Sequence, residues 1–438
     1  MRPREEEFGT SIERLFPGTK MVRTVTVQVT DACNLRCTYC YQIAKKNHRI
    51  PVDVAISYIK QVLDGDNPYI NLENTGGIIL DFIGGEPTLA MDVIEEVTEW
   101  AVNYMIDNHH PWATRFRASI CSNGTTYEAD PRIKRYLHKW GPLVSMTFSI
   151  DGNKQLHDAC RVFPDGRGSY DLAAAAAQSY AKEFNYGRMP ATKLTLAPTN
   201  VQYFCDAHIN LIETLGYRSI FCNCCYEKGW TIEHAKILYK EMKKLTDWLF
   251  EHEMANDVYI SIFDDKVGGS DPTDRNWCGG TGEMISVDWK GDIYPCIRYM
   301  ESSLGDDQPP VIIGTVEGGI AATEEQKKCI DCLKCITRSS QSTKECMECP
   351  ISQGCAWCSG YNYQEFGTAN KRATHICEMH KARVLANLYF WAKFKLRYPD
   401  DIEEGCHEWN IPDEWAEAII GKDECDMIKA LLKSLPKD

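Results

Sequence analysis

The chain lacks the features that would attach it to a membrane or direct it out of the cell. No stretch of about twenty apolar residues occurs in it, so no membrane-spanning helix is indicated. Residues 1–15 are charged and contain no apolar core, which excludes a secretory signal peptide. We therefore expect a cytoplasmic protein that has no membrane partner.

An excess of basic residues is also missing. The 48 Lys and Arg residues are outnumbered by 62 Asp and Glu residues, and the formal net charge is −14. A chain with this charge has no overall field that attracts nucleic acid, so we expect no nucleic-acid partner. An apolar fraction of 44% is ordinary for a globular protein and argues against long disordered stretches.

Cysteine, in contrast, is plentiful. In a reducing compartment, clusters among the 21 cysteines indicate metal binding or redox chemistry rather than disulfides. Three lie at 33–40, three at 222–225 and ten at 278–377. The other five are isolated, and we expect buried packing residues or inert thiols at Cys121, Cys160, Cys205, Cys406 and Cys425.

Strand patterns alternate with helix patterns through the first half of the chain. Strands are predicted at 22–29 and within 76–87, 115–125, 143–152, 192–200 and 217–223; helices are predicted at 51–63, 92–105, 131–140, around 173–177 and at 207–215. This order favours an α/β fold with a parallel sheet and crossover helices, either open or closed into a barrel. The polar loops DACN, GGEP, SNG and SIDG follow successive strands, so we expect the site at the carboxyl ends of the strands.

The first cysteine group has the spacing C-x3-C-x2-C on the loop after the first strand: Cys33, Cys37 and Cys40. Three thiolates can bind one face of a cubane iron–sulfur cluster and leave one iron without a protein ligand. A zinc site completed by a residue such as His48 is the alternative, although zinc sites favour paired C-x2-C knuckles.

This loop, followed by Gly84-Gly85-Glu86-Pro87, resembles the radical S-adenosylmethionine (radical SAM) superfamily. The resemblance implies a partial (β/α)6 TIM-like barrel in which a [4Fe–4S] cluster on Cys33, Cys37 and Cys40 cleaves S-adenosylmethionine to a 5′-deoxyadenosyl radical. It also implies that the GGEP segment holds the methionyl amino group and that Arg161 pairs with the carboxylate. Further candidate cofactor contacts are Tyr39, Ser122, Ser149 and Asp151. Loop capping and surface ion pairs are the alternative roles for these polar residues.

The second cysteine region resembles the SPASM extension of radical SAM enzymes, which carries two auxiliary [4Fe–4S] clusters. Mapped onto that pattern, the nearer cluster takes Cys278, Cys296 and Cys358, and the distal cluster takes Cys346, Cys349, Cys355 and Cys377. Two departures leave the nearer cluster with either an open iron or a borrowed ligand: only two residues separate Cys355 from Cys358, where the family usually has three, and no second cysteine closely follows Cys278.

Two cysteine groups have no assignment from the sequence. Cys329, Cys332 and Cys335 either complete the nearer cluster, bind another metal or exchange electrons as thiols. Cys222, Cys224 and Cys225 either face the active site or are simply buried.

The expected organisation is an N-terminal segment (1–20), the barrel (21–230), a helical bridge (231–275), the SPASM region (276–380) and C-terminal helices (381–438).

The segment at 149–171 is similar to that of anaerobic sulfatase maturases, which oxidise Cys or Ser to formylglycine. Those enzymes have a carboxylate base directly after the cysteine that corresponds to Cys296, whereas this chain has Ile297 and then Arg298. Asp264, Asp265 or Asp292 would have to replace it.

We therefore predict a maturase that installs a thioether or related crosslink in a cysteine-containing, ribosomally made peptide, with flavodoxin or ferredoxin as electron donor. Formylglycine generation is the alternative within the family. A non-catalytic multi-zinc scaffold and an iron–sulfur electron carrier are alternatives from other classes.

Overall fold

A single sheet runs through most of the chain. The computed structural model describes residues 21–435 except 66, 275, 277 and 400–407, so the predicted segment 1–20 and Cys406 lie outside the described residues. Within the described part the strand order is β11-β10-β9-β8-β1-β2-β3-β4-β5-β6-β7. The strands are β1 (Val22–Thr30), β2 (Gly77–Gly84), β3 (Phe116–Ser122), β4 (Val144–Phe148), β5 (Thr192–Leu196), β6 (Ser219–Cys224), β7 (Tyr259–Ile260), β8 (Ile285–Val287), β9 (Asp292–Tyr294), β10 (Gly314–Thr315) and β11 (Gly319–Ile320).

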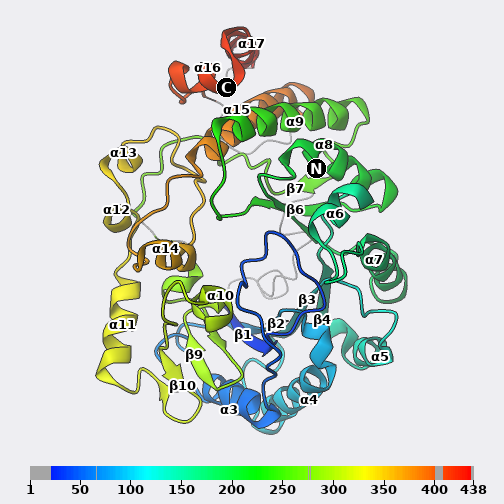
Figure 1. Cartoon of the computed structure of the whole chain (residues 1–438), viewed down its shortest axis with the longest axis vertical. Coiled ribbons are helices and arrows are strands. Elements are labelled where there is room, and N and C mark those ends of the chain that lie inside the picture. Colours follow the sequence, from blue (N-terminus) through cyan, green and yellow to red (C-terminus); the bar gives the residue numbers. More distant parts are fainter. Residues whose placement is uncertain (1–20, 66, 275, 277, 400–407, 436–438) are drawn as a thin grey trace.

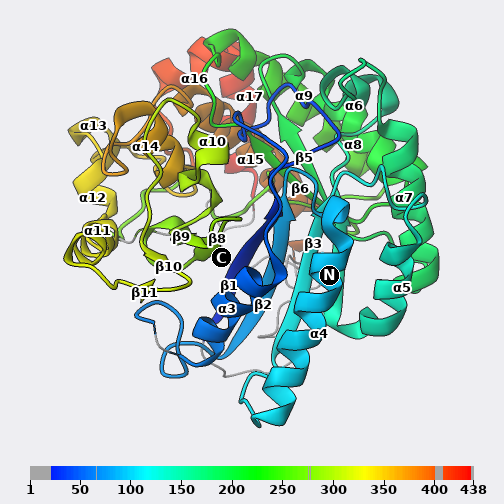
Figure 2. The same cartoon turned by 60° about the horizontal axis from the view of Figure 1, so that its bottom comes forward.

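Strands β1 to β6 are parallel and neighbour one another in sequence order. The helices that connect them ring the outside of the sheet (Figures 1 and 2). They are α3 (Val52–Leu63), α4 (Met91–Asp107), α5 (Pro131–Trp140), α6 (Lys154–Cys160), α7 (Tyr170–Phe184) and α8 (Phe204–Ile209). Consecutive parallel strands with helices on one side form a barrel-like α/β architecture, so the predicted fold class is confirmed.

The two faces of this sheet differ in chemistry. Val25, Leu80, Ala118 and Val144 pair in register across β1 to β4 and are buried beneath the helices. The next residue along each strand points to the opposite face. On that inner face the side chains are mostly polar, which leaves the inside of the barrel as the place for a polar site.

The cysteine-rich half continues the same sheet. Strand β8 pairs in parallel with β1, and β8 and β9 form an antiparallel hairpin shortly before Cys296. The sheet of the barrel therefore extends into this region, whose predicted start is residue 276. Its helices lie on the left of Figure 1: α10 (Glu301–Leu304), α11 (Glu324–Lys334), α12 (Arg338–Gln341), α13 (Lys344–Met347) and α14 (Ser359–Phe366).

Long helices close the upper end of the molecule in Figure 1. Helix α9 (Ile232–Glu251) packs along α15 (Cys377–Arg397), and α16 (Asp413–Ile420) and α17 (Lys422–Lys433) pack against them. Phe390 of α15 stacks on Phe263 with ring centroids 4.4 Å apart. Among the described residues, no helix combines the length and the apolar character needed to span a membrane.

Candidate active site

The cysteine loop that follows β1 is bonded to the loop that follows β2. The backbone N–H groups of Gly85 and Glu86 donate to the carbonyls of Thr30 and Ala32 at 3.0 and 2.9 Å. A Cβ on Gly85 would lie 2.3 Å from the Ala32 carbonyl oxygen, so only glycine allows this approach. The GGEP segment is thus seated directly against the start of the cysteine loop.

Glu86 connects the loops after β2 and β3. One carboxylate oxygen accepts hydrogen bonds from the Thr88 N–H at 3.1 Å and the Ser122 hydroxyl at 2.8 Å, and the other accepts from the Asn123 N–H at 2.7 Å. Burial raises the pKa of Glu86, and these hydrogen bonds lower it. The Asn123 amide also donates to Asn34 of the cysteine loop at 2.8 Å. Glu86 and Ser122, both predicted cofactor contacts, therefore also hold the rim of the barrel together.

The loop after β4 holds the other side of the cysteine loop. The backbone N–H groups of Arg36 and Thr38 donate to the carbonyls of Val162 and Cys160, at 2.7 and 3.0 Å. Cys37 lies between these two bonds, so its position is fixed by main-chain contacts from the end of α6.

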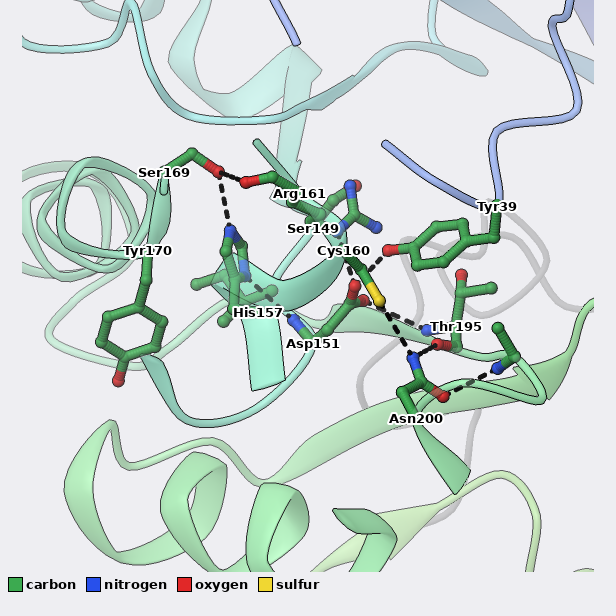
Figure 3. Close-up of polar contacts among 12 residues, drawn as sticks. Tyr39, Ser149, Asp151, His157, Cys160, Arg161, Ser169, Tyr170, Thr195 and Asn200 are labelled. Carbon is green, nitrogen blue, oxygen red and sulfur yellow. Dashed lines mark hydrogen bonds and ion pairs between the residues drawn. The ribbon is translucent and has the colours of Figure 1, made fainter. Parts of the chain in front are cut away.

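Tyr39, Asp151 and Arg161 form one buried cluster (Figure 3). Asp151 is 0% exposed; its carboxylate accepts from the Tyr39 hydroxyl, from Arg161 Nε at 2.9 Å and from the Thr195 N–H at 3.2 Å. The sequence predicts a cofactor contact for Asp151, but the structure surrounds it with protein donors and gives it a positioning role. Among the described residues no hydrogen bond reaches the terminal nitrogens of Arg161, which remain available for a carboxylate.

His157 and Ser169 support this cluster from behind and were not singled out from the sequence. The Asp151 N–H donates to His157 Nδ1 at 3.3 Å, and His157 Nε2 lies 2.9 Å from the Ser169 hydroxyl, which donates to the Arg161 carbonyl at 2.8 Å. Burial lowers the pKa of His157 to about 4, so the ring is neutral. The four-residue step from His157 to Arg161 along α6 is the signal that connects them.

The three thiols of the first group lie together. Cys37 interacts electrostatically with both Cys33 and Cys40, and Cys33 interacts with Cys40. Burial raises the pKa of Cys37 to about 11, while the nearby Arg161 guanidinium lowers it. Cluster ligands have to be deprotonated, so an electropositive neighbour assists binding.

The remaining predicted contact, Ser149, lies just beyond β4 with its side chain partly exposed on the inner face. Its hydroxyl is 3.7 Å from the thiol of Cys121 on β3. Cys121 is exposed, whereas the isolated Cys160, Cys205 and Cys425 are buried as expected. Of the two roles expected for the isolated cysteines, a buried packing residue and an inert thiol, Cys121 does not have the first, because its side chain points to the open inner face.

The cysteines predicted for the nearer auxiliary cluster also meet. Cys296 interacts electrostatically with Cys358 and Cys278. A Cβ on Gly280 would lie 3.2 Å from the Cys296 sulfur and 3.6 Å from the Cys278 sulfur, so glycine keeps space open beside both. The buried Ser359 hydroxyl lies 3.1 Å from the Cys278 sulfur.

The four cysteines predicted for the distal cluster form another group. Cys355 interacts electrostatically with Cys349 and Cys346, and Cys377 interacts with Cys355 and Cys346. Arg372 donates to the Cys355 carbonyl at 3.0 Å and lowers the pKa of that thiol against the larger effect of burial.

The unassigned cysteines lie outside the three groups of converging thiols, although two of them come close to Cys355 of the distal group. Cys222 and Cys224 are on the outer face of β6, where with Cys355, His380 and Arg383 they line a small cavity. They do not point into the barrel, so of the two readings of this group the structure favours burial. Cys329, Cys332 and Cys335 follow one another along α11, and the last two are exposed.

Tyr41 and Arg298 connect the first cysteine group to the nearer auxiliary group. The buried Tyr41 hydroxyl interacts electrostatically with both Cys40 and Cys296, and the Arg298 guanidinium lies 4.4 Å from the centre of the Tyr41 ring. Arg298 also pairs with Glu227 at 3.0 Å. A cleft of about 450 Å³ opens at this point; it is lined by Tyr41, Ile43, Glu227, Lys228, Asp307, Gln308, Tyr361, Gln364 and Glu365.

The donor sets fit iron–sulfur clusters. Three or four thiols converge at each of the three places, and Gly280 leaves room at one of them. Among the described residues, no three His, Cys, Asp or Glu side chains are gathered around one point as for a single ion. A cubane holds its ligands on separate iron atoms, so it needs the wider arrangement.

The chain is similar in sequence to known maturating enzymes. No protein-family profile matches the chain. The cysteine-type anaerobic sulfatase-maturating enzyme of Clostridium perfringens is 26% identical over 293 residues, which cover 62% of this chain and 73% of that enzyme. Mycofactocin maturase MftC of Mycolicibacterium smegmatis is 22% identical over 290 residues, which cover 65% of this chain and 67% of that protein.

Solved structures extend the similarity to the fold. The structure of anSMEcpe with bound AdoMet and the Kp18Cys peptide matches with a TM-score of 0.61 and 19% identity, over 87% of this chain and 100% of that chain. SuiB of Streptococcus suis bound to its precursor peptide SuiA matches with a TM-score of 0.54 and 12% identity, over 81% of this chain and 76% of that chain. At these identities the structures establish a shared fold.

Proposed function

We propose that this chain is a radical SAM enzyme with a SPASM-type cysteine-rich extension, and that it matures a peptide by installing a thioether or related crosslink. Its cofactors are [4Fe–4S] clusters and S-adenosylmethionine. Flavodoxin or ferredoxin is the proposed electron donor.

The residues that hold the cofactors follow from the site. Cys33, Cys37 and Cys40 would hold the cluster that binds S-adenosylmethionine, and bound there the pair would supply a 5′-deoxyadenosyl radical for hydrogen abstraction from the substrate. The backbone of Gly84 and Gly85, kept in place by Glu86, would receive the methionyl amino group. Arg161 would bind the carboxylate through its terminal nitrogens, and Asp151 fixes the direction of that guanidinium. Tyr39 would shield the cluster from water.

The proposal rests on the cleft beside Tyr41, a residue that lies near both the first cysteine group and the nearer auxiliary group. Tyr41 lines this cleft and is within electrostatic reach of Cys40 and Cys296, so a substrate bound in the cleft would lie on the side of Tyr41 that both cysteine groups approach. A crosslinking reaction has to remove an electron after the hydrogen atom is taken, and an adjacent cluster is a suitable acceptor. The bound peptides of anSMEcpe and SuiB support a peptide as the substrate class.

Formylglycine generation is the second candidate. It is favoured by the similarity to the Clostridium perfringens enzyme and by the match to all of the anSMEcpe chain. The residues after Cys296 speak against it, because Ile297 and Arg298 provide no carboxylate base at that position.

Mass spectrometry of a co-expressed peptide distinguishes the candidates. Cysteine-containing open reading frames beside the gene are the peptides to test, and the Cys33→Ala, Cys37→Ala, Cys40→Ala triple variant is the matched control. Loss of two hydrogens with a new link between side chains supports crosslinking. A cysteine converted to an aldehyde supports formylglycine generation instead. A colourless protein that contains zinc and yields no 5′-deoxyadenosine would overturn both.

A further inference from the structure

The inner face of the parallel strands contains one carboxylate. Residues that pair in register share a face, and alternate residues along a strand repeat it. By this rule the inner face of β1 to β6 is formed by Thr24, Thr26, Gln28, Ile79, Asp81, Ile83, Arg117, Ser119, Cys121, Ser145, Thr147, Lys193, Thr195, Ser219, Phe221 and Asn223. Asp81 is the only acidic residue in this set.

Asp81 lies in the middle of β2, below the GGEP segment. It pairs in register with Thr26 of β1 and Ser119 of β3, and the Ser119 hydroxyl is its hydrogen-bond partner. Two residues further along the same face comes Ile83, next to Gly84, so Asp81 is about 10 Å along the strand from the turn that would hold the cofactor. A substrate side chain that reaches into the barrel from the rim would meet it.

The environment of Asp81 increases the proton affinity of its carboxylate. Loss of water on the inner face raises its pKa to about 6, and the Ser119 hydrogen bond lowers it by less. The other ionisable groups on the inner face are Arg117, Lys193 and the Cys121 thiol; none of them contributes to this shift. A carboxyl group that titrates near neutral pH suits a general base.

We propose that Asp81 is the base that accepts a proton from the substrate side chain during peptide modification. The proposal rests on the proposed function. In the step itself, the S–H or O–H bond of the substrate breaks, an O–H bond forms on the Asp81 carboxylate, and the electron pair remains on the substrate atom. Crosslinking through sulfur and formylglycine formation both require this proton to leave.

The carboxylates considered from the sequence lie elsewhere. The Asp264 carboxylate lies 3.8 Å from the guanidinium of Arg383 on α15, and the Asp264 N–H donates to the Asn387 side-chain oxygen at 2.8 Å. Asp265 is its neighbour in the chain. Asp292 begins β9 at the turn of the β8–β9 hairpin. None of the three is on the inner face of β1 to β6, where Asp81 is the one acidic residue.

Asp81→Asn separates a chemical role from a structural one. Asparagine has nearly the same shape and still accepts the Ser119 hydrogen bond, but it does not take up a proton. In the reconstituted full-length enzyme we expect 5′-deoxyadenosine formation to stay within about twofold, while modified peptide falls by about 100- to 10 000-fold. Asp81→Glu should recover part of the product. Glu241→Gln on α9, which also removes a carboxyl group of raised pKa, is the matched control and should change neither quantity.

Two further measurements do not depend on turnover of the loaded enzyme. In the full chain without added cofactor, infrared titration should show a carboxyl band with a midpoint near pH 6 that is absent from Asp81→Asn. Affinity for the substrate peptide should be the same in wild type and Asp81→Asn. In wild type, product formation should rise with pH through about 6, because the base has to be ionised.

The outcomes separate this proposal from the proposed function. If wild type forms neither 5′-deoxyadenosine nor modified peptide, the proposed function fails. If wild type forms both and Asp81→Asn does so equally well, the function stands and the role of Asp81 is refuted. If Asp292→Asn lost product formation while Asp81→Asn kept full activity, the base would be Asp292 of the β8–β9 hairpin. The role of Asp81 would then be refuted.

Discussion

The two cysteine-bearing regions differ in what holds their thiols in place. At the barrel rim, the loop with Cys33, Cys37 and Cys40 is bonded to the loops after β2, β3 and β4, all of which leave a sheet whose outer face is buried. In residues 324–377 several thiols lie on short elements or at their ends: Cys346 is in the four-residue α13, and Cys358 caps α14. The barrel site is therefore built on the hydrophobic core, and we expect the auxiliary region to depend more on its metal for order.

Replacing the first three thiols is the strongest test of this difference. In the Cys33→Ala, Cys37→Ala, Cys40→Ala variant, 5′-deoxyadenosine formation should fall to background because no ligand is left for the cluster that binds S-adenosylmethionine. The fold should persist, since the loop is held by main-chain bonds that do not use the thiols. Chromatographic assay of 5′-deoxyadenosine and circular dichroism measure the two effects. Cys425→Ala, a buried thiol of α17, should retain activity; its inactivity would contradict the assignment.

Iron removal should affect the two regions unequally. Most residues at 324–377 are exposed or half-buried, so without clusters to crosslink this segment we expect rapid hydrogen exchange and proteolysis there. Strands β1 to β6 should remain protected. Hydrogen-exchange mass spectrometry before and after chelation reports both regions in one experiment. Equal loss of protection in the barrel would show that the rim also depends on its cluster.

Breaking the buried ion pair between Asp151 and Arg161 should have a smaller effect, which divides between the stability of the fold and the affinity for S-adenosylmethionine. Asp151→Asn leaves the Arg161 guanidinium without its anion in a buried place, which should cost about 3 kcal/mol of unfolding free energy. Because Arg161 then loses its fixed direction, S-adenosylmethionine should bind about tenfold more weakly. Denaturant unfolding and calorimetric titration measure these quantities. Asp171→Asn, which breaks an exposed pair with Lys154, is the control; equal effects in both variants would remove the positioning role.

The same comparison explains what the sequence was able to predict. Around β1 to β6 the alternation of strand and helix patterns located the elements and placed the motif loops on one rim. The membership of the cysteine groups followed from spacing and resemblance, and the structure brings the same residues together. The burial of Asp151 and the exposure of Cys121 were out of reach, because both depend on which face of a neighbouring strand meets water. Arg298 over Tyr41 joins residues far apart in sequence, and only tertiary packing relates them.

Acid sensitivity gives the finest comparison, because the buried His157 at the rim and the half-buried His380, which lines a cavity with Cys355, both stay neutral. Burial lowers the pKa of His157 at the rim and of His380 on α15 to about 4. An unfolded histidine titrates near 6.5, so the stabilising effect of each neutral ring is complete above about pH 6.5 and is lost as the pH falls toward 4. Each histidine should contribute up to about 3 kcal/mol over this window.

Single replacements resolve the contribution of each region. In His157→Gln or His380→Gln, the dependence of unfolding free energy on pH between 6.5 and 4 should weaken by about one proton. Denaturant titrations at several pH values measure this slope. The exposed His109 on the turn after α4 provides the control, and His109→Asn should leave the slope unchanged. If only His380→Gln flattened the slope, the rim would gain no stability from its neutral histidine, and His157 would serve chiefly to orient Asp151 and Arg161.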